Sequence, residues 1–196
     1  MLMDFILNAA GQIDAAKVLF LLGQVFSLCS AASLIISSLR AKKEKIMFWQ
    51  LMESFFTTLT DLCLGAYSAG ITNFLAATRN TLLIKKKYSK FAMIACTLVS
   101  VVLGMLVNTI GWVGGLAIVA GLIANIGLYY AKSDQNIRSV LFLVLIFWSV
   151  HDFIVGAYPI ALVELLSTIG LFVNFVRVSK KNKKSKKHKK GRRITL

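Results

Sequence analysis

The sequence has little charge and almost no proline. Only 16% of its 196 residues are charged, eight are acidic and one is proline, whereas 57% are hydrophobic. Soluble domains have about 25% charged and 45–50% apolar residues, so this composition excludes an ordinary soluble globule, and it excludes disorder for most of the chain. The three cysteines are isolated within apolar runs, which favours buried thiols over a disulfide framework or a metal site.

Apolar runs predict an all-α integral membrane protein with seven transmembrane helices. Alternate connections are rich in lysine and arginine, whereas the connections between them carry no charge. Because basic loops favour the cytoplasmic side, we expect the N-terminus outside and the C-terminus inside. Residues 1–17 are expected to form an interfacial segment ahead of the first span. The predicted spans are 18–38, 46–66, 69–84, 91–108, 112–130, 139–156 and 159–176.

An internal repeat relates the two halves of the chain. DLCLGAY (61–67) and DFIVGAY (152–158) match at an offset of 91 residues, and the same offset superposes the first three spans on the last three. Since the offset crosses four spans, both copies would have the same orientation. We therefore predict two parallel three-helix units, 18–84 and 112–176, joined by a linker helix at 91–108.

These residues resemble the YgjV family of bacterial inner-membrane proteins. The resemblance rests on LGAYSAGITNFLAATRN (64–80) and WSVHDFIVGAY (148–158), followed by Glu164 and Asn174. It covers about residues 18–178 and implies a multi-pass protein of the bacterial cytoplasmic membrane. The 3+1+3 layout is similar to that of SWEET and PQ-loop transporters. The chain has no Pro-Gln pair and no proline in its first unit, so a proline-hinged mechanism is not implied.

Two opposite charges are expected near the middle of the bilayer. Glu53 and Arg79 lie at matching depth on sequential predicted spans. A lone charge at the bilayer centre costs about 2.5–3.5 kcal/mol on insertion scales, so the two side chains are expected to pair. The pair would act either as an inner gate linked to substrate or protons, or as a fixed clasp between helices.

A second polar group lies nearer the outer ends of the spans. Asp152 and Glu164, with His151 adjacent, should not both be ionised in a low dielectric, which predicts a proton-binding site. In the alternative interpretation each carboxylate binds backbone near the outer surface. The repeat places Asp61 and Asn73 at the positions of Asp152 and Glu164, so a substrate site between the units would be lined by both pairs. Trp148 lies deeper and either lines that cavity or packs in the core.

The C-terminal segment 177–196 is a basic cytoplasmic tail without apolar periodicity. We expect it to bind anionic lipids of the inner leaflet; in the alternative it only fixes the topology. A nucleic-acid partner is disfavoured because no aromatic residues alternate with the lysines. The predicted lipid-binding residues are Lys180, Lys181, Lys183, Lys184, Lys186, Lys187, Lys189, Lys190, Arg192 and Arg193.

The buried polar residues and the repeat predict a transporter of a small solute. The rival hypothesis is a membrane scaffold or a partner-binding subunit that transports nothing. We do not expect an enzyme, because no catalytic triad, P-loop or dinucleotide motif occurs. One His-Asp dipeptide cannot supply three metal ligands, so neither a cofactor nor a metal site is predicted.

Overall fold

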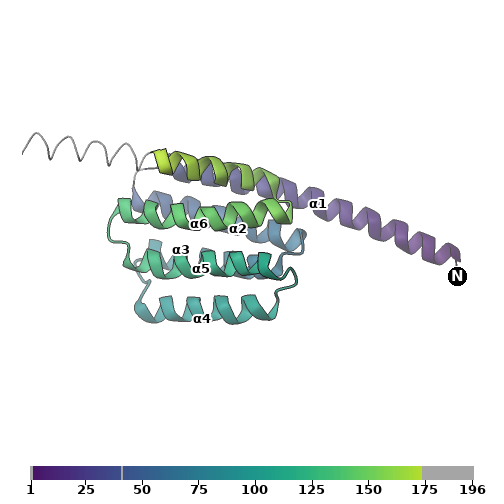
Figure 1. The fold of residues 1–196 in the computed structure, drawn as a ribbon, viewed down its shortest axis with the longest axis horizontal. Helices are drawn as coiled ribbons and strands as arrows, with labels where there is room; N and C mark the ends of the chain where they lie inside the picture. The colour runs from purple at the N-terminus through teal and green to yellow at the C-terminus, as the bar shows by residue number, and fades with distance from the viewer. Residues whose placement is uncertain (1, 41, 174–196) are drawn as a thin grey trace, which may run out of the picture.

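The computed structural model describes residues 2–40 and 42–173, with side chains for 15–40, 42, 44–133 and 135–173. This part of the chain forms seven helices and contains no strand, as the apolar runs predicted. The last helix is the unlabelled yellow-green one in Figure 1. The helices are α1 (Leu2–Ser38), α2 (Lys43–Cys63), α3 (Tyr67–Ile84), α4 (Lys90–Leu106), α5 (Trp112–Tyr130), α6 (Asp134–Val155) and the last helix, Tyr158–Val173.

Three of these helices are long and apolar enough to cross a membrane, over Ala15–Ser38 of α1, Trp112–Tyr130 and Gln135–Val155. α4 and the last helix are apolar but shorter within the described residues. α2 and α3 are less apolar because they carry polar side chains that are buried in the bundle, among them Asp61, Asn73 and Arg79.

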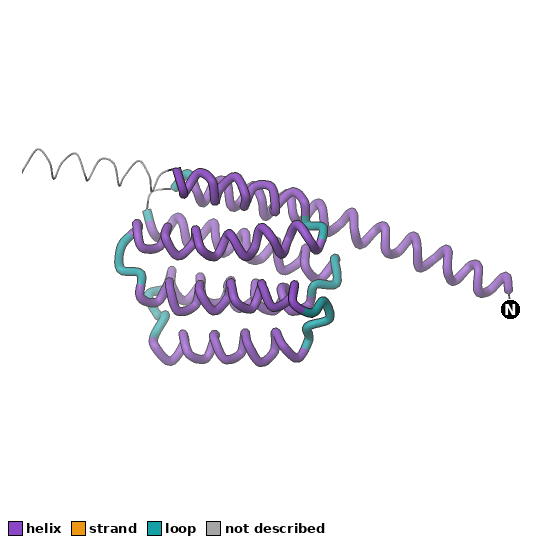
Figure 2. The backbone as a smooth tube through the Cα atoms, in the orientation of Figure 1, coloured by secondary structure: helices purple, strands orange, loops and turns teal. Residues whose placement is uncertain are grey.

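The helices form two rows that face each other. α1, α2 and α3 make one row, and the last helix, α6 and α5 make the other, while α4 packs against α3 and α5 at one edge (Figures 1 and 2). Ser27 on α1 accepts a hydrogen bond from the backbone N–H of Ile160, which joins the rows at the opposite edge. Between the middle helices, α2 and α6, side chains from both rows fill the interior.

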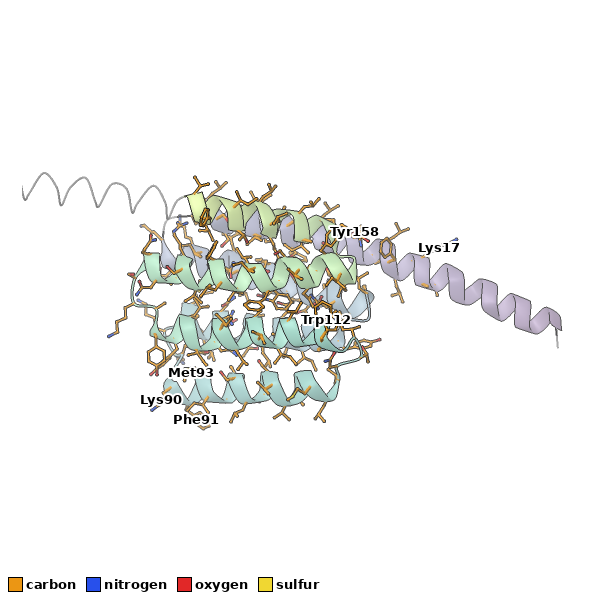
Figure 3. The ribbon with its side chains drawn as sticks, in the orientation of Figure 1. Lys17, Lys90, Phe91, Met93, Trp112 and Tyr158 are labelled. Carbon is orange, nitrogen blue, oxygen red and sulfur yellow. The ribbon has the colours of Figure 1, made fainter. Side chains whose placement is uncertain are left out.

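The connections divide the bundle into two ends. The basic connections, 39–42, 85–89 and 131–133, lie together at one end, which we call the basic end (Figure 1). The other end, the uncharged end, holds the connections after α2, α4 and α6. Figure 3 shows Lys90 at the basic end and Trp112 and Tyr158 at the uncharged end. The alternation predicted from charge along the sequence is therefore present in the tertiary structure.

The repeated motif has the same local structure in both of its copies. Gly65 and Gly156 adopt positive φ angles of 75° and 91°, two residues after the end of α2 and one residue after the end of α6. The following alanines, Ala66 and Ala157, each donate a 2.8 Å backbone hydrogen bond to the carbonyl of the motif's aspartate. This is the Schellman ending of a helix, in which glycine avoids the steric cost of the left-handed conformation. The motif D-x-x-x-G-A therefore ends a helix and keeps its aspartate in the last turns.

The N-terminal part of the chain differs from the prediction. We expected residues 1–17 to form a separate interfacial segment, but α1 begins at Leu2 and continues without a break to Ser38. The first part of α1 projects beyond the bundle at the uncharged end (Figure 1). The predicted lipid-binding tail lies outside the described residues.

Candidate functional site

The structure brings together five of the polar residues that the sequence singled out. Asp61, Asn73, His151, Asp152 and Glu164, which we call the acidic cluster, come from α2, α3, α6 and the last helix. All five are buried between the two rows, with exposed fractions of 0–4%. The cluster lies toward the uncharged end, because both aspartates are in the last turns of their helices.

Hydrogen bonds orient the aspartates of the cluster. Asn73 donates a 2.8 Å hydrogen bond from Nδ2 to Oδ2 of Asp61. The Nδ1 atom of His151 lies 2.7 Å from Oδ1 of Asp152. The Asp152 carboxylate thus binds a side chain and not the backbone, in contrast to the alternative interpretation of this residue.

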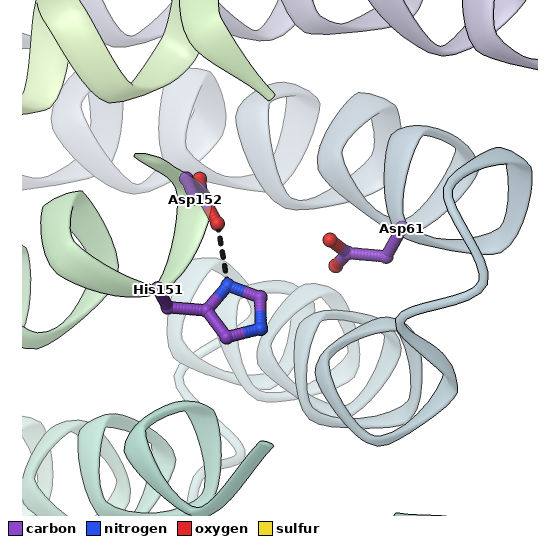
Figure 4. Close-up of side chains that lie close together, drawn as sticks. All are labelled: Asp61, His151 and Asp152. Carbon is purple, nitrogen blue, oxygen red and sulfur yellow. Dashed lines mark hydrogen bonds and ion pairs between the residues drawn. The ribbon is translucent and has the colours of Figure 1, made fainter. Parts of the chain in front are cut away.

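His151 has a fixed orientation between its neighbours. Its ring makes an edge contact with the ring of Trp148, with the centroids 5.3 Å apart. Figure 4 shows the imidazole between the two aspartates, with Nδ1 turned to Asp152 and the opposite edge of the ring facing Asp61. Trp148 is buried and also lines the central cavity, so both roles that the sequence left open for it are present.

A small cavity lies between the rows, next to the acidic cluster. Its volume is about 30 Å³, and a water molecule needs about 10–15 Å³ by the same kind of measure. Five helices line it. Its polar and charged lining comprises Gln50, Glu53, Ser54, Thr72, Asn73, Arg79 and Glu164.

Glu53 and Arg79 both line this cavity, but they do not form a direct ion pair in the described part of the chain. The Arg79 guanidinium donates instead to two amide side chains, through Nη1 to Oδ1 of Asn125 at 3.0 Å and through Nε to Oδ1 of Asn80 at 3.2 Å. The Glu53 carboxylate accepts a long hydrogen bond of 3.4 Å from the Ser54 hydroxyl. The buried guanidinium is therefore held by neutral acceptors.

The sequence analysis missed the residues that hold Arg79. Asn125 is buried on α5, and the available signal was that it is the single amide within an apolar run. Tyr88, in the connection after α3, donates a 3.2 Å hydrogen bond to the backbone carbonyl of Asn125. Burial raises the pKa of Tyr88 to about 12, so its hydroxyl stays protonated and remains a donor at ordinary pH.

Hydroxyl groups between α1 and α2 were also missed. The hydroxyls of Ser30 and Thr57 lie 2.5 Å apart, and Thr60 donates to the carbonyl of Gly23 at 3.4 Å. Serines recur on α1 every three or four residues, and Ser27, Ser30, Ser33 and Ser37 are all buried. This helical spacing was the signal for a buried polar stripe. Ser30 and Ser37 bond to α2, and Ser27 bonds to the last helix.

A larger pocket toward the basic end adjoins the central cavity. Its volume is about 260 Å³, and Ser38 and Arg138 are among the residues that line it. Gln50, Leu141 and Leu145 line both this pocket and the central cavity. Those three side chains separate the pocket from Glu53 and Arg79. The pocket and the central cavity are therefore neighbours with a shared wall.

The chain was compared with known proteins. No curated protein and no solved structure matches it. The family described as Imp-YgjV, bacterial inner membrane protein, matches residues 21–182. This match spans six of the seven described helices completely. It also covers every candidate site residue ahead of the tail, and Lys180 and Lys181 within it. The all-helical bundle, with its membrane-length apolar helices, has the architecture expected of such a protein. The chain therefore belongs to the Imp-YgjV family of bacterial inner membrane proteins.

Proposed function

We propose that this membrane protein transports a small solute, bound between two parallel three-helix units, 18–84 and 112–176. The observation that carries the proposal is the central cavity, whose charged and amide side chains come from both rows of helices. Ionisable groups inside a membrane protein are costly and usually mark a solute or ion pathway. A bundle that served only as a scaffold would not need such groups at its centre.

The proposed solute site consists of the acidic cluster and Trp148. His151, Asp152 and Glu164 would also bind a transported proton, since closely spaced carboxylates in a low dielectric share protons. Glu53 and Arg79 lie nearer the basic end than Asp61 and Asp152, at the position of an inner gate. In this proposal all seven helices span the membrane, with the basic end in the cytoplasm and the N-terminus outside.

Alternating access would come from rocking of one row against the other. Two observations support this mechanism. The repeated motif ends α2 and α6 with the same turn, so equivalent helices in the two rows end alike. The pocket at the basic end shares three lining residues with the central cavity, so a small movement of these side chains would connect the two.

One observation favours the rival function of a scaffold or partner-binding subunit. The central cavity holds about 30 Å³, which is enough for only one or two water molecules. Transport requires this cavity to enlarge, whereas a scaffold would keep it closed. The two functions therefore differ in whether solute crosses a membrane that contains the protein.

Flux into proteoliposomes tests the proposal. The protein is reconstituted without partners, and uptake of a chemically broad panel of labelled solutes is measured. Each solute is assayed with a pH gradient directed into the liposomes and with one of the same size directed outward. We expect uptake of at least one class above empty liposomes, and loss of this uptake in the double variant Asp61→Asn, Asp152→Asn. Glu44→Gln, an exposed acid at the basic end, is the matched control and should retain flux. Uptake that persists in the double variant would overturn the site assignment, and absence of uptake across the panel would favour the scaffold.

A further inference from the structure

Three fully buried side chains of the acidic cluster converge on one point. Asp61, His151 and Asp152 each place a nitrogen or oxygen atom within 4.8 Å of the corresponding atoms of the other two. Asp61 comes from α2 and the other two residues from α6, so the row-to-row packing creates the group (Figure 4). Each of the three residues has an exposed fraction of 0%.

Each of these side chains has one polar atom held and one polar atom without a partner. Asp61 is held at Oδ2 by Asn73, and Asp152 is held at Oδ1 by His151. The atoms without a hydrogen-bond partner are Oδ1 of Asp61, Oδ2 of Asp152 and Nε2 of His151. Buried polar atoms are almost always satisfied. Unpartnered buried atoms on all three residues therefore point to a bound species within this group.

The protonation of His151 follows from its contact with Asp152. Nδ1 is the ring nitrogen that faces Asp152, so an ion bound by both residues takes the place of the hydrogen between them. The hydrogen of the neutral ring is then on Nε2. The contact with Trp148 fixes the plane of the ring.

The charges around the group also favour a bound cation. Among the described residues, the ion pairs of the molecule do not provide a lysine or arginine for Asp61 or Asp152. Arg79, the buried cation on the neighbouring helix, binds Asn80 and Asn125. Buried carboxylates are normally paired with a cation or coordinate a metal. Glu164, whose Oε2 is likewise buried and unpartnered, is a further carboxyl group of the acidic cluster.

We propose that Asp61, His151 and Asp152 bind a divalent first-row transition-metal ion, with Zn²⁺, Co²⁺ and Mn²⁺ as representative ligands of this class. Imidazole with carboxylate oxygens suits these ions, whereas Mg²⁺ and Ca²⁺ prefer oxygen ligands alone. Metal–ligand bonds of about 2.1 Å place any two ligand atoms at most about 4.2 Å apart. The group therefore needs to contract by only a few tenths of an ångström per side chain around the ion.

This site was not visible in the sequence, where His151-Asp152 alone offered too few ligands. The tertiary structure adds Asp61 from a position 91 residues earlier in the chain. The site lies within the solute-binding region of the proposed transporter, but the inference concerns binding and does not require the ion to be carried across the membrane.

Metal binding to the purified full chain tests the proposal. The protein is prepared without a polyhistidine tag, stripped with a chelator in detergent, and titrated with Co²⁺ and with Zn²⁺ by calorimetry. Visible absorption of bound Co²⁺ reports nitrogen and oxygen coordination. We expect one ion per chain, with a Kd at least about tenfold weaker in His151→Gln and in Asp61→Asn. Asparagine at position 61 keeps an acceptor for Asn73, so this variant is expected to fold.

The chain offers a matched control, because it has only two histidines. His188→Gln removes the other one, in the basic tail, and should leave the Kd unchanged. The proposal is overturned if the wild-type protein binds neither ion, which would mean that the cluster holds protons only. It is also overturned if His151→Gln or Asp61→Asn binds as tightly as wild type, which would mean adventitious binding. Solute flux is not measured in this experiment, so a failure of the transport proposal leaves its result unaffected.

Discussion

Asn73 on α3 donates a 2.8 Å hydrogen bond to the Asp61 carboxylate on α2, and both side chains are buried. This bond joins two helices of one row at the edge of the central cavity. It also leaves the second carboxylate oxygen of Asp61 free to face His151 and Asp152 on the other row.

Replacing Asn73 by leucine should destabilise the protein by about 1–3 kcal/mol, because the buried Asp61 oxygen loses its donor. The free energy of unfolding in mixed detergent micelles measures the effect. Thr78→Val on the exposed face of the same helix is the control and should change stability by less than about 0.5 kcal/mol. Equal stabilities of Asn73→Leu and wild type would contradict the proposed role of the bond.

Arg79→Lys should be destabilising although it keeps the charge. A lysine lacks the planar fork that reaches Asn80 and Asn125 at the same time, so at least one buried amide loses its donor at a cost of about 1–3 kcal/mol. A double-mutant cycle with Asn125→Ala should give a coupling energy of about 0.5–3 kcal/mol. Arg138→Lys, at the exposed basic end, serves as the control. Additive effects of the two substitutions would show that Arg79 and Asn125 are not coupled.

Gly121→Ala should disturb the packing of α5 against α3. A Cβ atom at Gly121 would lie 2.6 Å from Cγ2 of Thr72, whereas one at Gly115 on the same helix would have no neighbour within 4 Å. We expect a loss of about 1–3 kcal/mol for Gly121→Ala, and no loss for Gly115→Ala, which improves helix propensity by up to about 1 kcal/mol.

A rescue experiment identifies the cause of the Gly121 effect. Thr72→Ser removes the clashing Cγ2 but keeps the hydroxyl, which donates to the Ser68 carbonyl at 2.9 Å. The double variant Gly121→Ala, Thr72→Ser should therefore recover most of the stability measured in micelles. If the double variant is no more stable than Gly121→Ala, the steric explanation is wrong.

The two ends of the bundle should be accessible from opposite sides of the inner membrane. In a variant without Cys29, Cys63 and Cys96, a single cysteine is introduced at exposed Lys86, at the basic end, or at exposed Thr109, at the uncharged end. A membrane-impermeant maleimide should label Lys86→Cys in inverted vesicles and Thr109→Cys in right-side-out vesicles, because basic loops stay in the cytoplasm. Labelling of both from the same side would refute the proposed topology.

Most of the fold follows from patterns that are local in the sequence. The predicted span 112–130 coincides with α5, and the other runs each correspond to one helix. The predicted spans differ from the observed helices mainly in where the helices begin and end. Ser133 caps α6 by accepting from the N–H of Asn136, so the helix begins before the apolar run predicted at 139–156. α1 begins at Leu2 and not near residue 18, because no proline and no glycine turn interrupts the helix between Leu2 and Ser38.

The candidate site could be predicted only in part. The burial of Asp61, Asp152, Glu164 and Arg79 was expected from their place in apolar runs, since ionisable groups in such runs turn inward. The partner of Arg79 could not be predicted, because Glu53 and Asn125 are both within the interior. Only the packing of α5 beside α3 decides that Arg79 binds Asn125.

The sequence by itself determined an all-helical membrane protein, the number of its helices, the division into a basic and an uncharged end, and the polar residues of its interior. These properties depend on hydropathy and turn chemistry, which act over a few neighbouring residues. Only the tertiary structure decided which polar atoms meet. It placed Asp61 beside His151-Asp152 and Asn125 beside Arg79, because lateral helix packing sums many weak contacts between residues far apart in the chain.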